Sequence, residues 1–410
     1  MPISIERILA DIDAIGQFTD TPGTGVTRRT FSTAWQAARD YVQRQLESIG
    51  CKVHLDAVGN LHARPDAIAW DAPAWMSGSH LDSVDYGGNY DGVVGVVLAL
   101  ESLRAAREDL KVALPMELVV WTESAGAGTF QGVHQIGSRA FVGELDATTL
   151  DQSGYSKAGA AHGVRPQHIG EAEQQLSTRS TLGYVEVHAE QGPQLWNQDC
   201  PIGLVTSISG RRAYRCEVTG LAQQAGSTPM NHRRDALAAA AELIVALENI
   251  ALEPGNGALI TVGEMSLQPN RSDMTCGQAV FSIDLHSPAT DELARGDGMI
   301  REAIERIMQK RQLAAEVTLL ASEPAIEMNA LVSQKIERVA APLCADGAVS
   351  KISTGGVHDA AVLAAHVPSA MILVASRDGI SHSPDEFCRP ADLAMAARVL
   401  FNTVKDRRLE

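Results

Sequence analysis

Apolar positions follow two alternating rhythms along the first third of the chain. Between Ser32 and Ile49 they recur every three or four residues, which indicates a helix with one buried face, and Gly50 is suited to end it. Residues 51–57 then alternate between apolar and polar, as a half-buried strand does. The patterns that follow predict a strand at 75–80, a helix at 93–107 and a buried strand at 116–121. Such a mixture indicates an α/β sheet with helices on its faces.

The middle of the chain has a different pattern. It predicts strands at 213–218, 258–262 and 279–285, and long helices at 234–250 and 292–310. Together these elements form an α+β unit of about 110 residues, a size that can fold alone. Strand and helix patterns alternate again after Val317. We therefore predict an α/β domain, made of residues 1–210 and 325–410, that is interrupted by a smaller α+β domain at 211–324.

Composition and charge restrict the class of protein. The chain has 410 residues, of which 45% are hydrophobic, and its 34 basic and 50 acidic residues give a net charge of −16. This acidity argues against nucleic acid or an anionic membrane as a partner. No apolar run reaches the roughly 18–20 residues that span a bilayer, and the first 16 residues lack the apolar core of a secretory signal. The six cysteines include no Cys-x-x-Cys pair, so we expect a cytoplasmic protein without disulfides.

The strongest local signal for chemistry surrounds the predicted strand at 75–80. His80 ends this strand, Asp82 is placed to orient its imidazole, and Asp91 follows a Gly-Gly turn just before a predicted helix. α/β proteins bind ligands at the loops that follow such strands, and His and Asp suit zinc, manganese, cobalt or nickel. Taken by itself, this segment is explained equally well by a tight turn next to an ordinary polar histidine.

Two later segments add to this signal. The alternation in residues 183–193 places Glu186, His188 and Glu190 on one face of a strand. His382 lies in a loop rich in Ser and Pro, close to Asp385. Taken singly, each histidine is more simply a hydrogen-bonded structural residue, so the interpretation depends on the whole set.

The ordered set of motifs carries a resemblance over nearly the whole chain. The motifs are Gly25-Val-Thr-Arg, Asp56-Ala-Val-Gly-Asn-Leu, Gly78-Ser-His-Leu-Asp-Ser-Val, Tyr90-Asp-Gly, Gly137-Ser-Arg-Ala-Phe, His188-Ala-Glu-Gln-Gly-Pro, Ala225-Gly-Ser-Thr-Pro-Met, Arg234-Asp-Ala, His358-Asp-Ala and Ile380-Ser-His-Ser-Pro. In these motifs the chain resembles the hydantoinase/carbamoylase-type amidases of the M20 metallopeptidase superfamily. That group contains N-carbamoyl-L-amino acid hydrolases, β-ureidopropionases, and allantoate or ureidoglycolate amidohydrolases.

The resemblance implies a site for one or two divalent ions and a homodimer. His80, Asp91 and His188 match the ligands of one ion, while Asp91 and His382 match ligands of a second. Asp82 matches the residue that supports His80, and the insert matches a lid and dimerisation domain. The metal would polarise an amide or ureido carbonyl and activate a water molecule, and a glutamate would accept the proton.

The sequence departs from the family where that glutamate should be. The family has Thr-Asn-Glu-Glu-Gly, in which the first Glu is the base and the second a metal ligand; the simplest alignment puts Ser124 and Ala125 at these positions. Ser does not act as a base unaided at neutral pH, and Ala offers no lone pair. Glu123 is the nearest acid and could fill one of the two roles, but not both.

The residues that would contact the substrate also differ from the family. Gln224 replaces a His, Asp273 replaces an Asn, and His286 replaces the Arg that binds a carboxylate. A His lacks the charged two-pronged geometry of Arg, so we expect a substrate without a free α-carboxylate. The full predicted set of substrate-binding residues is Gln191, Gln224, Asn270, Asp273, His286 and His358.

These observations predict a metal-dependent amidohydrolase with an atypical site. It would cleave a C–N bond in a small amide, N-carbamoyl or ureido compound, with Glu123 and Asp82 as the catalytic residues. The missing glutamates leave a second interpretation open, namely an inactive small-molecule-binding protein on the same fold. An aminopeptidase-like member of the superfamily fits the Gln191-Gly-Pro and Gly87-Gly88 segments less well.

Overall fold

The chain folds into two compact units in a computed structural model. The structure describes residues 3–125, 129–130, 133–169, 181–253, 257–344 and 349–408. The first unit comprises Met1–Thr206 and Glu327–Glu410, and the second comprises Ser207–Ile326. The insert predicted at 211–324 lies within the second unit.

A mixed sheet forms the centre of the first unit. Among the described residues it has nine strands in the order β1-β2-β4-β3-β5-β14-β6-β12, with β13 paired to β6. The strands are β1 (Cys51–Leu55), β2 (Leu61–Pro65), β3 (Ala74–His80), β4 (Met116–Trp121), β5 (Thr181–Ala189), β6 (Ile202–Ile208), β12 (Ile326–Glu327), β13 (Ser350–Thr354) and β14 (Ser369–Val374). The neighbours β4, β3, β5 and β14 are mutually parallel, so their carboxyl ends meet at one edge of the sheet.

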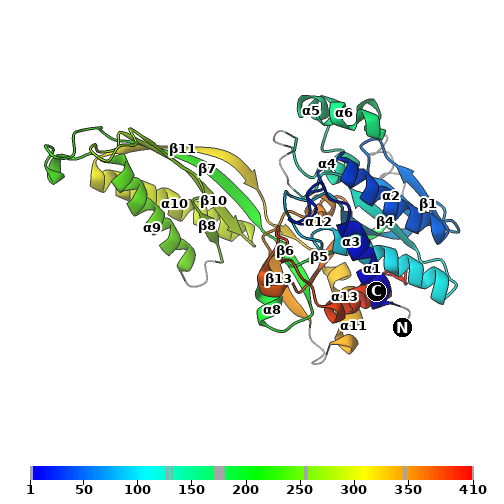
Figure 1. The fold of residues 1–410 in the computed structure, drawn as a ribbon. Coiled ribbons are helices and arrows are strands. Elements are labelled where there is room, and N and C mark those ends of the chain that lie inside the picture. The colour runs from blue at the N-terminus through cyan, green and yellow to red at the C-terminus, as the bar shows by residue number, and fades with distance from the viewer. Residues whose placement is uncertain are drawn as a thin grey trace. The chain divides into compact units, whose positions relative to one another are not determined.

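Helices pack on both faces of this sheet (Figure 1). Val185 and Val187 of β5 belong to the large core that α3 shares with α1, α2, α11 and α13, whereas the intervening Glu186 bonds to Ala360 of α12. Because successive strand residues face opposite sides, α12 lies on the other face. The longer helices are α1 (Ile5–Gly16), α2 (Thr33–Ser48), α3 (Val93–Arg104), α11 (Ala330–Ala340) and α13 (Pro390–Val404). The shorter ones are α4 (Ile136–Phe141), α5 (Ala147–Gln152), α6 (Tyr155–Gly159), α8 (Gln194–Asn197) and α12 (Asp359–Ala364).

The helix predicted at 93–107 ends earlier than its apolar pattern indicated. All 12 residues of α3 are buried, and the chain continues as a π-helical turn at Ala105–Asp109. Val and Gly favour a helix weakly, so burial against the sheet rather than local propensity stabilises α3. Its first residue follows Asp91 by two positions, and packing of this helix therefore fixes the loop that carries Asp91.

The second unit is an antiparallel sheet covered by two helices. Its strands are β7 (Gly210–Thr219), β8 (Leu259–Thr261), β9 (Met265–Gln268), β10 (Gln278–Ser287) and β11 (Ala314–Glu323). Both α9 (Ala236–Leu252) and α10 (Thr290–Arg311) cover the same face, as Figure 1 shows. Every second residue of β10, including Phe281 and Ile283, is buried beneath them. This unit therefore has its own hydrophobic core.

Two negative findings accompany the fold. No helix in the described part of the chain has the length and apolar character needed to cross a membrane. All six cysteines are described, and each is a free thiol.

Candidate metal centre

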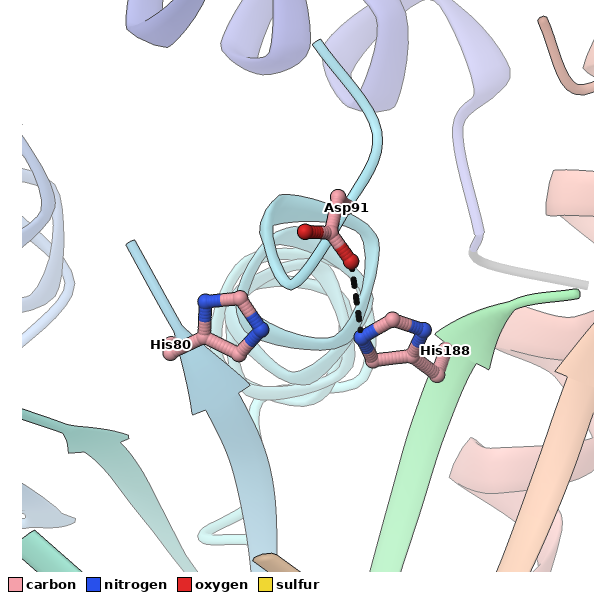
Figure 2. A group of neighbouring side chains, drawn as sticks. All are labelled: His80, Asp91 and His188. Atoms are coloured by element: carbon pink, nitrogen blue, oxygen red, sulfur yellow. Dashed lines mark ion pairs between the residues drawn. The ribbon is translucent and has the colours of Figure 1, made fainter. Parts of the chain in front are cut away.

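His80, Asp91 and His188 come together at the carboxyl edge of the parallel strands. His80 is the last residue of β3, and His188 lies near the end of the adjacent strand β5, where Gly78 is in register with Glu186. Asp91 lies in the loop before α3, and its carboxylate faces the His188 imidazole in Figure 2. One ligand atom from each residue lies within 4.8 Å of the others. No other group of three or more potential ligands occurs among the described residues.

Main-chain carbonyl groups hold both imidazoles so that Nε2 is available. Nδ1 of His80 lies 2.9 Å from the Asp82 carbonyl oxygen, and Nδ1 of His188 lies 2.9 Å from that of Ala189. A carbonyl oxygen only accepts, so each Nδ1 carries a proton. Nε2 of His188 also accepts from the Gly92 N–H, which shows that its lone pair is unprotonated in this tautomer. This arrangement is usual for metal-bound histidine.

The lone pair of His188 faces a carboxylate without a proton between them. Nε2 of His188 lies 3.3 Å from Oδ1 of Asp91, and the two side chains are only 2% and 5% exposed. Burial lowers the pKa of His188, which keeps its imidazole neutral. Two acceptors facing each other in a buried site are stabilised by a cation between them. The donor set of two imidazole nitrogens and a carboxylate therefore fits zinc, manganese, cobalt or nickel.

The charges at this site keep Asp91 ionised. Burial alone would raise the pKa of Asp91, but its hydrogen bond to His382 and the charges of His80 and His382 hold it below the ordinary value. Burial opposes protonation of His80, yet the nearby carboxylates of Asp82 and Asp91 raise its pKa to about 8. The carboxylates of Asp82 and Asp91 thus favour a positive charge at this site, which a divalent cation would supply in place of the proton on His80.

Gly92 makes the close approach of this loop to His80 feasible. Its φ of +67° is rarely adopted by other residues, and an added Cβ would lie 2.5 Å from Nδ1 of His80. The residue after Asp91 therefore has to be glycine for Asp91 and His80 to keep these positions.

Asp82 supports the site differently from the prediction. Its main-chain carbonyl, rather than its carboxylate, binds His80, because Oδ1 is 3.8 Å from Nδ1. Oδ2 instead accepts the N–H groups of Ser124 and Ala125 at 2.9 and 2.8 Å. Asp82 thus connects the His80 segment to the turn that follows β4.

Glu123 lies at this turn in an unusual environment. It follows β4 by two residues, has a φ of +56°, and is only 1% exposed. Its Oε2 has no hydrogen-bond partner among the described residues. Burial, with the neighbouring charge of Asp82, raises the pKa of Glu123 to about 7. A carboxyl group with these properties is suited to exchange protons near neutral pH.

Ser124 contacts Asp359, a buried acid that lies near a second buried acid, Glu186. Its hydroxyl donates to Oδ2 of Asp359 at 2.7 Å, and Ser138 donates to Oδ1 at 2.5 Å. Glu186 accepts from Ser79 and from the Ala360 N–H nearby. Residue patterns gave no indication of this role for Asp359, because it depends on contacts between distant segments.

Three other predicted residues in the first unit lie next to the three-residue cluster. Nε2 of His382 is 3.4 Å from Oδ2 of Asp91, and the Gln191 amide nitrogen is 3.4 Å from Oδ1. The His358 ring packs against His188 with a centroid distance of 4.6 Å. His382 and Asp91 have no third described ligand for a second ion.

The remaining predicted substrate residues belong to the second unit. Gln224 and Asn270 are exposed, and His286 lies 3.4 Å from Asp284. Asp273 forms a two-pronged ion pair with Arg271. Arg271 therefore offsets the charge of Asp273, which weakens the argument that Asp273 repels an anionic substrate.

Comparisons with known proteins agree with this fold. A model of the peptidase family M20/M25/M40 matches residues 53–406. The chain is 33% identical over 405 residues to an N-carbamoyl-L-amino acid amidohydrolase from Geobacillus stearothermophilus, covering 97% of each. It is 30% identical to a ureidoglycolate hydrolase from Arabidopsis thaliana, covering 97% of this chain and 86% of that one. The structure of a hydantoinase/carbamoylase family amidase from Burkholderia ambifaria matches 99% of this chain and 98% of that one, with a TM-score of 0.88 and 29% identity.

The fold and site together define an α/β protein with a candidate metal centre and a separate α+β unit. The family match extends over most of the chain, and the chain belongs to peptidase family M20/M25/M40. Its similarity to the hydantoinase/carbamoylase amidases confirms the resemblance predicted from the sequence.

Proposed function

We propose that this protein is a metal-dependent amidohydrolase that cleaves a C–N bond in a small amide, N-carbamoyl or ureido compound. The cluster of His80, Asp91 and His188 carries the proposal, because its buried, oriented donors suit a divalent cation. Relatives named as N-carbamoyl-L-amino acid amidohydrolases and ureidoglycolate hydrolases supply the reaction class. A bound ion would polarise the scissile carbonyl and lower the pKa of a water molecule.

Side chains of this protein would bind the ions, transfer the proton and bind the substrate. His80, Asp91 and His188 would hold one ion, and Asp91 with His382 would contribute to a second. Glu123 would accept the proton of the attacking water and deliver it to the leaving nitrogen, a role its buried carboxyl group supports. The contacts of Gln191 and His358 with this cluster support roles in binding the substrate. The proposal keeps Gln224, Asn270, Asp273 and His286 as further substrate-binding residues, on the resemblance alone.

Metal content is the direct test. We would load the wild type and the H80A and D91A variants with zinc, manganese, cobalt or nickel, remove free metal and measure ions per chain by mass spectrometry. His366, which is paired with Glu144 away from the cluster, gives the matched control H366A. We expect H80A and D91A to lose metal while H366A keeps it. Equal metal content in all four proteins would refute the assignment.

The absence of a Glu pair supports a second candidate, an inactive protein that binds a small molecule. Ser124 donates to Asp359 and Ala125 carries no polar group, so neither provides a base. Ammonia release from a panel of amides and N-carbamoyl compounds separates the candidates. Saturable binding without ammonia release under any of the four metals would favour the inactive protein. Ammonia release that E123Q abolishes would favour the enzyme.

The oligomeric state and location belong to the same proposal. We infer a homodimer formed through the second unit, whose edge strand β11 exposes Leu319 and Leu320. The edge of a sheet with exposed apolar residues is suited to a second copy. Light scattering should report a dimer that L320E weakens. The free thiols fit a reducing, cytoplasmic location.

A further inference from the structure

Glu386 connects the two loops that carry Asp91 and His382. Its Oε2 accepts the N–H groups of Tyr90 and Asp91 at 3.1 and 3.2 Å. Its Oε1 accepts the His382 N–H at 2.7 Å and lies 3.5 Å from the Ser381 hydroxyl. Each carboxylate oxygen therefore binds the main chain of one candidate ligand, and these ligands are 291 residues apart in the sequence.

The carboxylate of Glu386 is buried in a space that main-chain groups of the two loops enclose. The residue is only 7% exposed, and no cation forms an ion pair with it in the described part of the chain. Main-chain N–H groups and one hydroxyl are thus its stabilising partners. At Gly88 an added Cβ would lie 2.3 Å from Oε2 of Glu386 and 2.5 Å from the Ser383 carbonyl oxygen. Only glycine lets the two loops approach this closely.

The alternative supports for His382 are weaker. Its side chain is 45% exposed, and its φ of +56° is uncommon for a residue with a side chain. Its imidazole meets Asp91 at 3.4 Å and the Gln191 amide at 3.3 Å. Holding the imidazole at Asp91 therefore depends on the main chain of the loop, which Glu386 binds.

We propose that Glu386 is a positioning residue that keeps His382 against Asp91 and so sets the metal affinity of the site. This proposal rests on the proposed function, since it concerns the same metal centre. A glutamine at this position has one acceptor oxygen in place of two, and its amide N–H groups would face main-chain N–H donors. E386Q should therefore release one of the two loops.

The test is a double-mutant cycle read by metal binding. We would titrate the metal-free wild type, E386Q, H382A and E386Q/H382A with zinc or manganese and determine the dissociation constants by calorimetry. We expect E386Q to weaken binding by about 10–100-fold, as loss of a group supporting a ligand does. In the H382A background the same change should weaken it by less than about threefold, because the group that it positions is gone.

A matched control separates positioning from general stability. Glu190 is also buried and accepts two main-chain N–H groups, those of Gln194 and Leu195, but it does not bind the His382 loop. E190Q should therefore lower the unfolding temperature as E386Q does and leave metal affinity unchanged. G88A, which keeps the carboxylate but displaces it, should weaken metal binding in the same direction as E386Q.

The outcomes distinguish this proposal from the proposed function. If the wild type binds no metal, both fail. A second case is that the wild type binds metal. If E386Q then binds it equally well, or if the E386Q change weakens binding as much in the H382A background as in the wild-type background, only the proposed role of Glu386 is refuted. A smaller loss of metal affinity in the H382A background, together with unchanged metal affinity in E190Q, supports the proposed role of Glu386. If E386Q does not fold, G88A with H382A provides the same cycle.

Discussion

Replacing Asp359 with asparagine should make the protein more stable at neutral pH. The carboxyl group is completely buried between Ser124 and Ser138, and burial raises its pKa from 3.8 to about 6. At pH values between these two, the folded protein binds more protons at Asp359 than the unfolded chain does. The stability contributed by the protonated carboxyl is therefore present below about pH 4 and is lost as pH rises through about 6.

The size of this effect follows from the two pKa values. The gap between 3.8 and about 6 corresponds to a cost of about 3 kcal/mol for ionising this group in the folded protein. Asparagine has a similar shape and stays neutral, and its amide can accept from one serine hydroxyl and donate to the other. Burial raises the pKa of Glu186 to about 8 and the charge of Asp359 adds to this effect, so D359N relieves part of that cost as well.

Urea unfolding with a chelator present, at several values between pH 4.5 and 7.5, tests this reasoning. The free energy of unfolding of D359N relative to wild type should rise by about 2 kcal/mol across this pH range, and the rest of the total of about 3 kcal/mol develops below pH 4.5. D85N is the control, because Arg29 lowers the pKa of the exposed Asp85. D85N should therefore lower the free energy of unfolding, by an amount that is nearly constant over this pH range. A difference between D359N and wild type that is independent of pH would refute the argument.

Three further predictions concern the metal centre and its support. G92A should weaken zinc binding in a calorimetric titration, since the new Cβ would displace His80; unchanged affinity would contradict this. Zinc at about 100 times its dissociation constant should stabilise the wild type by roughly 2.7 kcal/mol and H188A much less, which thermal unfolding would reveal. N60A should cost about 2–4 kcal/mol in urea unfolding, because the buried Asn60 side chain accepts from the Thr122 N–H and donates to a carbonyl of a distant segment. A loss below about 0.5 kcal/mol would show that water replaces these bonds.

Apolar runs and apolar periodicity predicted the positions of the elements that bury most of their length or one face. The strand expected at 116–121 is β4, every residue of which is buried. The expected helix at 234–250 is displaced by two residues at each end, because Asp235 caps α9 through the N–H groups of Leu237 and Ala238. The π-helical turn after α3 was missed, since apolar spacing does not distinguish it from a continuing helix.

The candidate ligands were predicted from the ordered motifs, through the family that these motifs resemble. His80 and His188 meet because β3 and β5 are parallel neighbours, and the ordered motifs carried the same assignment. Supporting groups could not be predicted in this way. Glu386 lies in a loop of turn-forming residues, and Asp359 meets Ser124 across 235 residues of sequence. Such roles depend on tertiary contacts that no local pattern encodes.

The turn after β4 contacts Asp82 through its main chain, and not through the side chains at its tip. Asp82 holds the main chain of Ser124 and Ala125 whatever their side chains are, so their identity does not disturb His80. The geometry of His80, Asp91 and His188 therefore does not depend on those side chains, whereas Asp91 and His382 have no third described ligand. Under the proposed function, the absence of the paired glutamates would affect the second ion and the base rather than the first ion. Under the proposed function, proton transfer then depends on Glu123, whose buried carboxyl titrates in the range that this chemistry requires.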